Sequence, residues 1–259
     1  MSEEREAGAA GVSVSVERPG THPGVQVIRL CRPEKKNALT RAMYARMSEA
    51  LQAAEADDDL RVTVFLGQPG CFSAGNDMGD FAEAAAGGNF GAEVVGFLKM
   101  LAGGRKPLVS GVDGLAIGMG TTLHLHCDLT IATPRALFRT PFVDLGLVPE
   151  GGSSLLGPML LGPQRAFSLL ALGEPMSGAQ ALEAGLVAAL AEPEALEAAV
   201  LSAAARIAAK PPEALMAARR LLRGDPAVLI ARIEAEAAEF ARRLRSREAA
   251  AAIAAFLQR

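Results

Sequence analysis

The sequence predicts an α/β protein whose C-terminal part is helical. Short apolar runs rich in β-branched residues alternate with stretches of helical spacing, at intervals of roughly 40 residues. Glycine-rich segments directly follow two of these runs, as in folds that bind ligands at the carboxyl ends of parallel strands. From Pro193 onward the chain is rich in alanine, leucine and arginine. We therefore expect a disordered tail at residues 1–11, an α/β core at 12–192 and a helical region at 193–259.

The core is expected to open with a β-hairpin followed by a helix. VSVSVERP (Val12–Pro19) and VQVIRLCRP (Val25–Pro33) read as two antiparallel strands around the turn-forming GTHPG. Thr40 is expected to cap a helix from Arg41 to Ala56, because apolar residues recur at helical spacing after it.

Three further strands and one further helix are expected in the core. The strands are Val62–Gly67, Pro107–Val112 and Leu129–Ala132, and the helix is Ala92–Ala102. The region from residue 193 should form about three helices. Because their alanine-rich faces would leave apolar area exposed on a monomer, we expect these helices to pack against neighbouring subunits.

Composition and charge narrow the range of partners and compartments. The 259 residues include 26 basic and 29 acidic side chains, so the net charge of −3 gives no reason to expect nucleic acid or an anionic membrane. Cys31, Cys71 and Cys127 have no CxxC spacing, which indicates free thiols in a reducing compartment. The start, MSEEREAGAAG, lacks the features of a secretory signal, and no run approaches the roughly 20 apolar residues of a membrane span. We therefore expect a soluble, cytoplasmic protein.

Two glycine-rich segments outline an oxyanion hole, a pair of backbone N–H groups that holds one oxygen. AGN (Ala74–Asn76) and GMG (Gly118–Gly120) each follow a core strand. If both strand ends face one cleft, their amides can converge, and a helix starting near Met119 would add its dipole. A simple turn at each glycine is the alternative interpretation.

Motifs for other ligands are missing or incomplete. GMGTTL at Gly118–Leu123 lacks the last glycine of GxGxxG, and neither a P-loop nor a GxSxG elbow occurs in the chain. His124 and His126 are two residues apart, which on a helix puts them on different faces. We therefore expect ordinary core or surface roles for both, and no metal site.

Five segments of the chain form a familiar series in order and spacing. They are RPEKKNALT (Arg32–Thr40), FSAGNDM (Phe72–Met78), GLAIGMGTTLHLHCDL (Gly114–Leu129), TPFVDLGLVPEGGSS (Thr140–Ser154) and SGAQALEAGLV (Ser177–Val187). Together they resemble the enoyl-CoA hydratase/isomerase, or crotonase, superfamily over nearly the whole chain. The resemblance implies a crotonase-like spiral of ββα units that binds an acyl-CoA thioester. It also implies a homo-trimer or a dimer of trimers, and no cofactor apart from the CoA carried by the substrate.

The resemblance also assigns site residues by motif position. It implies that the amides of Asn76 and Met119 hold the thioester carbonyl oxygen and stabilise an enolate, with Glu150 as the catalytic glutamate. Residues implied around the substrate are Lys36, Ser73, Ala74, Gly75, Asn76, Asp77, Met78, Gly118, Met119, Thr122 and Phe142. Lys36 or its neighbour Lys35 is placed to meet CoA, an exposed ion pair being the alternative. Asp77 is expected to fix a turn or cap the next helix rather than to react.

The sequence departs from the hydratase pattern at two positions. Thr122 and Phe142 stand where hydratases of the family carry catalytic glutamates. The acids left near the expected cleft are Asp144 and Glu150, and Glu150 matches the single glutamate of the 3,2-enoyl-CoA isomerase branch. Adding water calls for a base and an acid, whereas moving a double bond needs one base that takes a proton from C2 and returns it to C4. We therefore expect an isomerase in which Glu150 reacts, unless it only balances a helix dipole, and in which Asp144 is structural.

Two other functions stay open at this point. The first is an enoyl-CoA hydratase, or another acyl-CoA lyase, that uses Glu150 in an unusual role. The second is a non-catalytic or RNA-binding member of the same fold, for which two arginine clusters could track phosphates. The arginines are Arg219, Arg220, Arg223, Arg242, Arg243, Arg245 and Arg247. The scarcity of aromatic residues and the negative net charge weigh against RNA.

Overall fold

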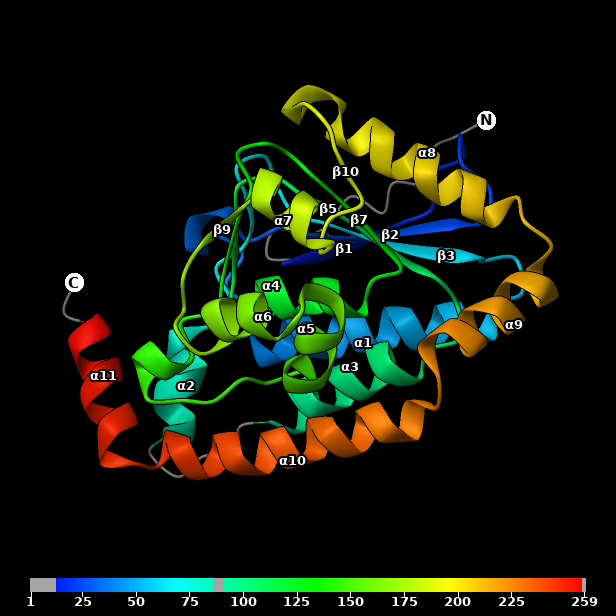
Figure 1. Ribbon diagram of the computed structural model, residues 1–259. Helices are drawn as coiled ribbons and strands as arrows, with labels where there is room; N and C mark the ends of the chain where they lie inside the picture. The colour runs from blue at the N-terminus through cyan, green and yellow to red at the C-terminus, as the bar shows by residue number, and fades with distance from the viewer. Residues whose placement is uncertain (1–12, 86–90, 258–259) are drawn as a thin grey trace.

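Two β-sheets with helices packed around them form the protein (Figure 1). The computed structural model describes residues 13–85 and 91–257, so the tail expected at 1–11 lies outside the described residues. The larger sheet contains β1 (Val14–Glu17), β2 (Val25–Leu30), β3 (Val62–Leu66), β5 (Leu108–Val112), β7 (Leu129–Ala132) and β10 (Ala189–Leu190), in that order. The smaller sheet contains β4 (Cys71–Ser73), β6 (Leu115–Ile117), β8 (Leu137–Arg139) and β9 (Met176–Ser177).

Successive strands of the core alternate between the two sheets. The strand β3 is followed by β4, β5 by β6, and β7 by β8, and helical segments follow each pair. In the larger sheet, β1 and β2 are antiparallel, with Val14 opposite Leu30, and every later pairing is parallel. These elements confirm the expected hairpin and the three later strands, and their repetition confirms the predicted spiral of ββα units.

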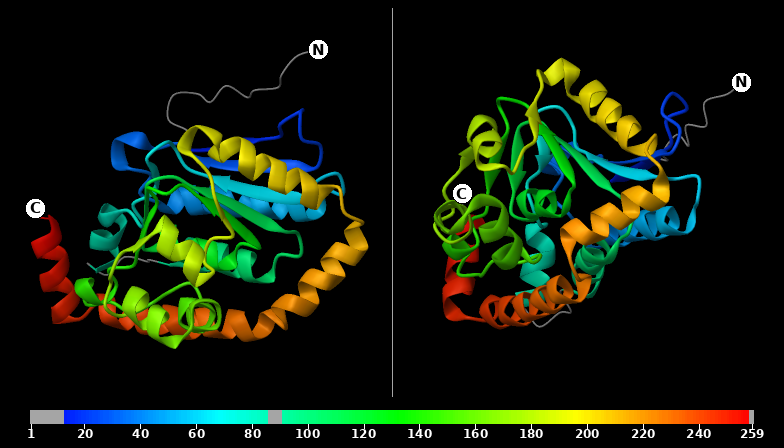
Figure 2. Two further views of the ribbon diagram at one scale, coloured as in Figure 1. Left: turned by 45° about the horizontal axis from the view of Figure 1, so that its top comes forward. Right: turned by 45° about the vertical axis from the view of Figure 1, so that its right-hand side comes forward.

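Helices cover both faces of the larger sheet (Figure 2). On the first face, α1 (Arg41–Ala56) packs against α3 (Ala92–Gly103), and the Thr40 hydroxyl accepts a hydrogen bond from Met43 N, which confirms the expected N-cap. The other helices of this part are η1 (Pro33–Lys35), α2 (Met78–Ala85), α4 (Met119–Thr122), η2 (Leu123–His126), η3 (Val143–Leu145), α5 (Ser153–Leu161), α6 (Pro163–Leu170) and α7 (Gly178–Ala184).

The C-terminal region contains four α-helices within the described residues, where about three were expected. After η4 (Pro193–Ala195) come α8 (Leu196–Ala208), α9 (Pro212–Arg223), α10 (Pro226–Leu244) and α11 (Arg247–Leu257). Helix α8 covers the second face of the larger sheet, while α10 runs along α3 and α5 (Figure 2). The expectation that these helices bury their apolar faces against other subunits is wrong for α8 and α10. Helix α9 carries the chain around the edge of the molecule, so both helices reach apolar surface of their own chain.

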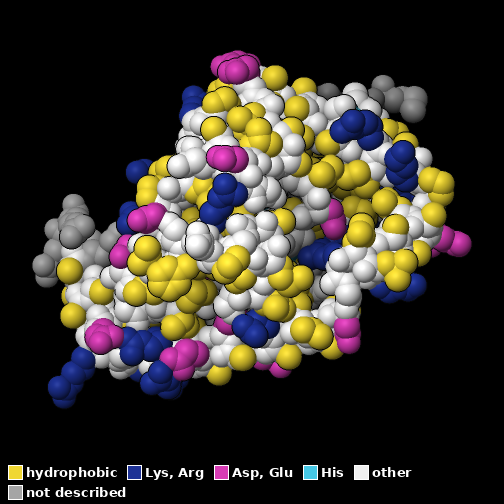
Figure 3. Space-filling model, viewed as in Figure 1, with side chains coloured by type: hydrophobic (Ala, Val, Ile, Leu, Met, Phe, Trp, Pro, Cys, Tyr) yellow, Lys and Arg dark blue, Asp and Glu magenta, His cyan; other side chains and the backbone are white. Residues whose placement is uncertain are grey.

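Large hydrophobic side chains are nevertheless exposed on the surface. They are Val143, Met159, Leu160, Phe167, Leu172, Leu182, Leu221, Leu222 and Val228. Figure 3 shows yellow side chains gathered over the region of α5 and α6 and around α8 and α9. Among the described helices, none combines the length and the apolar character needed to cross a bilayer.

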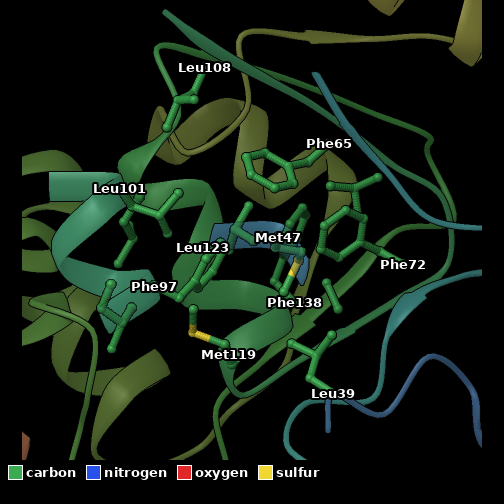
Figure 4. Close-up of a cluster of buried hydrophobic side chains, with 14 of the residues drawn as sticks. Leu39, Met47, Phe65, Phe72, Phe97, Leu101, Leu108, Met119, Leu123 and Phe138 are labelled. Atoms are coloured by element: carbon green, nitrogen blue, oxygen red, sulfur yellow. The ribbon is translucent and has the colours of Figure 1, made fainter. Parts of the chain in front are cut away.

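The main core lies between the larger sheet and the helices α1 and α3. It includes Phe65, Phe72, Phe97 and Leu101, and the side chain of Met119 points into the same cluster (Figure 4). Met119 is fully buried, so its side chain belongs to the core.

Candidate active site

A pocket opens between α3, α10 and the segment that precedes α5. Its described lining consists of Asn76, Gly91, Val94, Val95, Leu98, Glu150, Gly151, Ile233, Ala237, Phe240, Ala241, Leu244 and Arg245. The pocket holds about 700 Å³ of empty space, part of it open to solvent. Glu150 is the one carboxylate among the described lining residues. An apolar pocket with a few convergent polar groups is the usual form of a small-molecule site.

The two glycine-rich segments approach each other next to Asn76, which is their one residue among the described lining residues of the pocket. Gly75 and Gly118 have φ values of 88° and 56°, in the left-handed region where residues with a side chain are strained. A Cβ atom on Gly75 would lie 2.8 Å from the carbonyl oxygen of Ile117, so the two segments can touch only because this position is a glycine. The structure thus brings Asn76 and Met119, the residues that follow these glycines, to neighbouring places.

The amides of Asn76 and Met119 are both uncommitted. Asn76 forms a parallel bridge with Leu39 in which Leu39 N donates to Gly75 O and Asp77 N donates to Leu39 O. In this pattern the N–H of Asn76 itself points away from Leu39. Met119 is the first residue of α4, where an N–H has no partner inside the helix. Neither amide has a hydrogen-bond partner among the described residues; Asn76 lines the pocket, whereas Met119 is buried beside it and is not among the described lining residues.

A hydrogen bond from Tyr44 of α1 fixes the side chain of Asn76. The Tyr44 hydroxyl donates a hydrogen bond to Asn76 Oδ1, and its ring packs on Phe97 at a centroid distance of 5.5 Å. Complete burial raises the pKa of Tyr44 well above its ordinary value, so the hydroxyl stays protonated and keeps donating. The sequence had pointed to Asn76 but not to this partner.

Glu150 lines the pocket, and its two carboxylate oxygens differ in their hydrogen bonding. The side chain is only 7% exposed. The Thr122 hydroxyl donates to Oε1 over 2.6 Å, whereas Oε2 is buried and has no hydrogen-bond partner among the described residues. One oxygen therefore holds the carboxylate in place while the other remains available to exchange a proton.

Burial gives this carboxyl the acidity of a neutral-pH acid/base catalyst. Desolvation raises the pKa of Glu150 to about 7, the hydrogen bond from Thr122 opposes the rise, and the negative charge of Glu236 adds to it. A group with a pKa near the working pH can both accept and return a proton efficiently. Perturbed pKa values of this kind cluster at functional sites.

Several residues of the predicted substrate set shape the loop beside the pocket. Ser73 is fully buried, and its hydroxyl donates to Asn37 O and accepts from Gly75 N. Ala74 N donates to Lys36 O over 2.8 Å, which sets the exposed Lys36 alongside the loop.

Asp77 and Met78 continue this loop into α2. Asp77 accepts from Gly79 N at 2.8 Å and pairs with Arg32 at 2.6 Å, and Met78 is the first residue of the helix. Burial works to raise the pKa of Asp77, but the bonds from Arg32 and Gly79 outweigh it and lower the pKa. Asp77 thus has the turn-fixing environment that the sequence suggested.

Phe142 and Asp144 are not among the described residues that line the pocket. Phe142 is buried in a cluster with Phe81 and Phe240, and it is not among the described lining residues. Phe240 of the same cluster does line the pocket, so the expected place of Phe142 around the substrate is not found in the described lining. Asp144 is exposed in η3 and pairs with Arg139 at 3.0 Å.

The two histidines are buried and bonded individually. His124 Nδ1 lies 2.9 Å from Ser110 Oγ, and the ring packs between Phe72 and Phe138. His126 Nε2 lies 2.6 Å from Gly151 O, and because a carbonyl only accepts, this nitrogen carries the proton. Burial lowers the pKa of His126 to about 4, so the ring is neutral.

The arginine clusters are largely paired within the chain. Arg219 and Arg223 lie near Asp128, Arg242 pairs with Glu239, and Arg243 pairs with Glu248. Arg219 also donates to Gly104 O and is almost fully buried. These arginines therefore do not form the continuous unpaired surface that a phosphate backbone would need.

The pocket wall contributed by α10 was missed at the sequence level. Ile233, Ala237 and Phe240 of α10 line the pocket, whereas no residue of α5 is among its described lining residues. One signal was present in the sequence: Glu236 interrupts the apolar stripe of α10 that includes Ile233 and Phe240. An acid on an apolar helix face usually has a buried partner.

Comparisons with known proteins identify the family of this chain. The family model described as enoyl-CoA hydratase/isomerase matches residues 20–259. The solved structure of OdaA from Pseudomonas aeruginosa is 42% identical with a TM-score of 0.90, and the match covers 95% of this chain and 99% of that one.

Two curated relatives carry different activities in their names. Enoyl-CoA delta isomerase 2 from Homo sapiens is 36% identical over 170 residues, which are 63% of this chain and 43% of the human protein. The 2,3-dehydroadipyl-CoA hydratase from Escherichia coli (strain K12) is 32% identical over 164 residues, which are 63% of this chain and 64% of the hydratase. The chain thus spans less than half the length of the human relative. It belongs to the enoyl-CoA hydratase/isomerase family, with the crotonase fold.

Proposed function

We propose that this enzyme moves a carbon–carbon double bond in an enoyl-CoA thioester, converting a 3-enoyl-CoA to a 2-enoyl-CoA. Glu150 is the single acid/base, and the amides of Asn76 and Met119 hold the thioester oxygen. The reaction requires no cofactor besides the CoA of its substrate, and Lys36 contacts that CoA.

The observation that carries the proposal is the state of Glu150. It is the one carboxylate among the described pocket residues, and Thr122 occupies one of its oxygens while the other has no described partner. Hydration divides the activation of water and the protonation of carbon between two groups, whereas a double-bond shift uses one group twice. A single carboxylate with one available oxygen favours the shift.

The proposed reaction balances around this one proton. Glu150 Oε2 takes a proton from C2, and the C–H electron pair enters the conjugated system, so that the thioester becomes a dienolate. The amides of Asn76 and Met119 donate to the enolate oxygen, and each such donor is worth roughly 3 to 4 kcal/mol in comparable sites. Return of the proton to C4 places the double bond between C2 and C3 and restores the carboxylate.

The apolar lining suits this chemistry. Val94, Leu98 and Ile233 line the same pocket as Glu150 and give it apolar walls, which disfavour the entry of water that would otherwise add to the conjugated product. The same burial keeps the pKa of Glu150 near 7, so that the ionised and protonated forms are both accessible in the catalytic cycle.

A direct comparison of two substrates tests the proposal. The purified enzyme is given a 3-enoyl-CoA and, separately, crotonyl-CoA, and products are separated by chromatography and mass spectrometry. We expect conversion of the first to the 2-enoyl isomer and little addition of water to the second. Rapid hydration of crotonyl-CoA without any double-bond shift would exclude the isomerase in favour of a hydratase.

We also propose that the enzyme is a homo-trimer or a dimer of trimers. Met159, Leu160 and Phe167 on α5 and α6, with Leu221 and Leu222 on α9, expose apolar side chains that a closed assembly would cover. Light scattering should give a mass of three or six chains, and a stable monomer at micromolar concentration would exclude the assembly.

A further inference from the structure

An acidic residue lies on the buried face of α10. Leu229, Ile233, Phe240 and Leu244 form that face, and Glu236 falls in the same stripe with only 7% of its surface exposed. Burying a carboxylate is costly unless hydrogen bonds replace the lost water. Its partners should therefore reveal why the acid is there.

The partners of Glu236 are the first backbone groups of α5. Oε2 accepts from Gly152 N at 2.6 Å, and Oε1 accepts from Ser154 N at 2.9 Å and from Ser154 Oγ at 2.5 Å. The N-cap position of α5 is Gly152, which has no side chain to satisfy these amides. A carboxylate from α10 thus caps a helix that lies 84 positions earlier in the chain.

The capped segment carries Glu150. Only Gly151 separates Glu150 from Gly152, and both glycines have φ values near the left-handed region, at 72° and 74°. Such a link cannot hold the carboxylate by its own stiffness. Glu236 anchors its far side, and His126 holds Gly151 O at 2.6 Å.

We propose that Glu236 is a positioning residue for the Glu150 carboxylate: it fixes the start of α5 and ties the α10 wall of the pocket to the reacting group. This inference rests on the proposed role of Glu150. The bonds to Gly151 O and Gly152 N, with the hydrogen bond from Thr122, restrain the backbone and the side chain around the Glu150 carboxylate.

Glu236 also acts on Glu150 electrostatically. A helix N-terminus carries partial positive charge, which would stabilise a nearby carboxylate and lower its pKa. The charge of Glu236 opposes this effect and contributes to the raised pKa of Glu150.

The other groups around Glu150 and Glu236 differ in their protonation and hydrogen bonding. Thr122 of α4 donates to Glu150, Tyr44 of α1 is electrostatically coupled to it and protonated, and His126 of η2 is neutral. Burial raises the pKa of Glu236 itself, against the hydrogen bonds from Ser154 and Gly152 and the charge of Arg232.

The test compares three variants across pH. Glu236→Gln removes the charge at nearly constant shape, and Glu236→Asp keeps the charge but shortens the reach. Glu239→Gln is the matched control, because Glu239 lies on the same helix, is partly exposed and pairs with Arg242. The kcat and KM of each are measured from about pH 5 to 9, with the melting temperature as a check of folding.

Each variant has a distinct expected profile. Glu236→Gln should lower kcat about tenfold with KM nearly unchanged, and should move the acid limb of kcat down by about half a pH unit or more. Glu236→Asp should lower kcat with a smaller movement of the limb, and Glu239→Gln should match the wild type. Coincident profiles of Glu236→Gln and Glu239→Gln would overturn the inference.

Two precautions keep the outcome decisive. If Glu236→Gln does not fold, Ser154→Ala, which removes one bond to Glu236, is measured in its place. Ser154→Ala should lower kcat and move the acid limb of the kcat profile to lower pH, both by less than Glu236→Gln. An unchanged profile overturns the inference. If the wild type hydrates rather than isomerises, the proposed function fails, but the same profiles are read from hydration and still test Glu236.

Discussion

Asp144 and Glu150 lie in the same short stretch between β8 and α5, yet the structure gives them opposite surroundings. Asp144 faces solvent in η3 and forms an ion pair with Arg139. Glu150 is buried against hydrocarbon, with a hydroxyl on one oxygen and no described partner on the other. The difference teaches that burial and partners, not the presence of a carboxyl group, decide which acid can react near neutral pH.

The largest expected effect comes from removing the charge of Glu150. Glu150→Gln keeps the shape of the side chain but cannot take a proton, so turnover should fall by about 10² to 10⁴. Acyl-CoA affinity should change little, because the pocket and both amides remain. Turnover and equilibrium binding of a saturated acyl-CoA are measured separately. Full activity in this variant would mean that the buried acid is not the base.

A second test asks whether turnover depends on the N–H of Met119, one of the two amides proposed to hold the thioester oxygen. Met119→Pro deletes one N–H, while proline remains compatible with the first position of a helix. Turnover should fall roughly 10² to 10³.

Met119→Ala is the control for the second test, because it removes the same buried side chain but keeps the N–H. It should lose stability, by about 2 to 5 kcal/mol, yet keep turnover within about tenfold. Rates are compared at a temperature where both variants are folded. Equal rates would show that the thioester oxygen is held elsewhere.

The sequence was sufficient for the fold because each element carried a local signal. The strand β3 is a run of β-branched and aromatic residues, α1 has a threonine cap, and the turns at Gly75 and Gly118 are glycines that their φ values require. Motif positions also led to Asn76, Met119 and Glu150, whose environments now fit the proposed roles. These signals are local or depend on fixed spacing.

The remaining features depend on contacts between distant segments. Tyr44 meets Asn76, Thr122 meets Glu150, and Glu236 caps α5 only after the chain has folded. The path of α10 was also not predictable, because its apolar face could have packed on another subunit as well as on α3 and α5. Pairings of this kind leave no periodic trace in the sequence.

A smaller effect is expected from the hydroxyl that holds Glu150. Thr122→Val removes the hydrogen bond that lowers the pKa of Glu150, so the pKa should rise above about 7 and the acid limb should move to higher pH by about one unit. At pH near 7 fewer molecules then carry the ionised base, and turnover should fall about three- to tenfold.

The control for the Thr122 test is Thr121→Val, since Thr121 is equally buried but donates to Ala116 O. Its pH profile should keep the wild-type limb even if the protein is less stable. A Thr122→Val limb that moves to lower pH would contradict the arrangement around Glu150, because loss of a bond to the charged form can only raise the pKa of an acid.

The smallest effect should come from the exposed acid of the pair. Asp144→Asn breaks an ion pair whose side chains are 44% and 51% exposed, and such pairs contribute about 0 to 1 kcal/mol to stability. Thermal unfolding should therefore shift only slightly, and turnover should stay within about twofold, since nothing in the described pocket lining touches Asp144. The change from carboxylate to amide is the same as in Glu150→Gln, so the two variants differ in position alone. If Asp144→Asn instead abolished turnover while Glu150→Gln kept it, exposure and solvent access would decide the choice of base, and the roles of the two acids would be reversed.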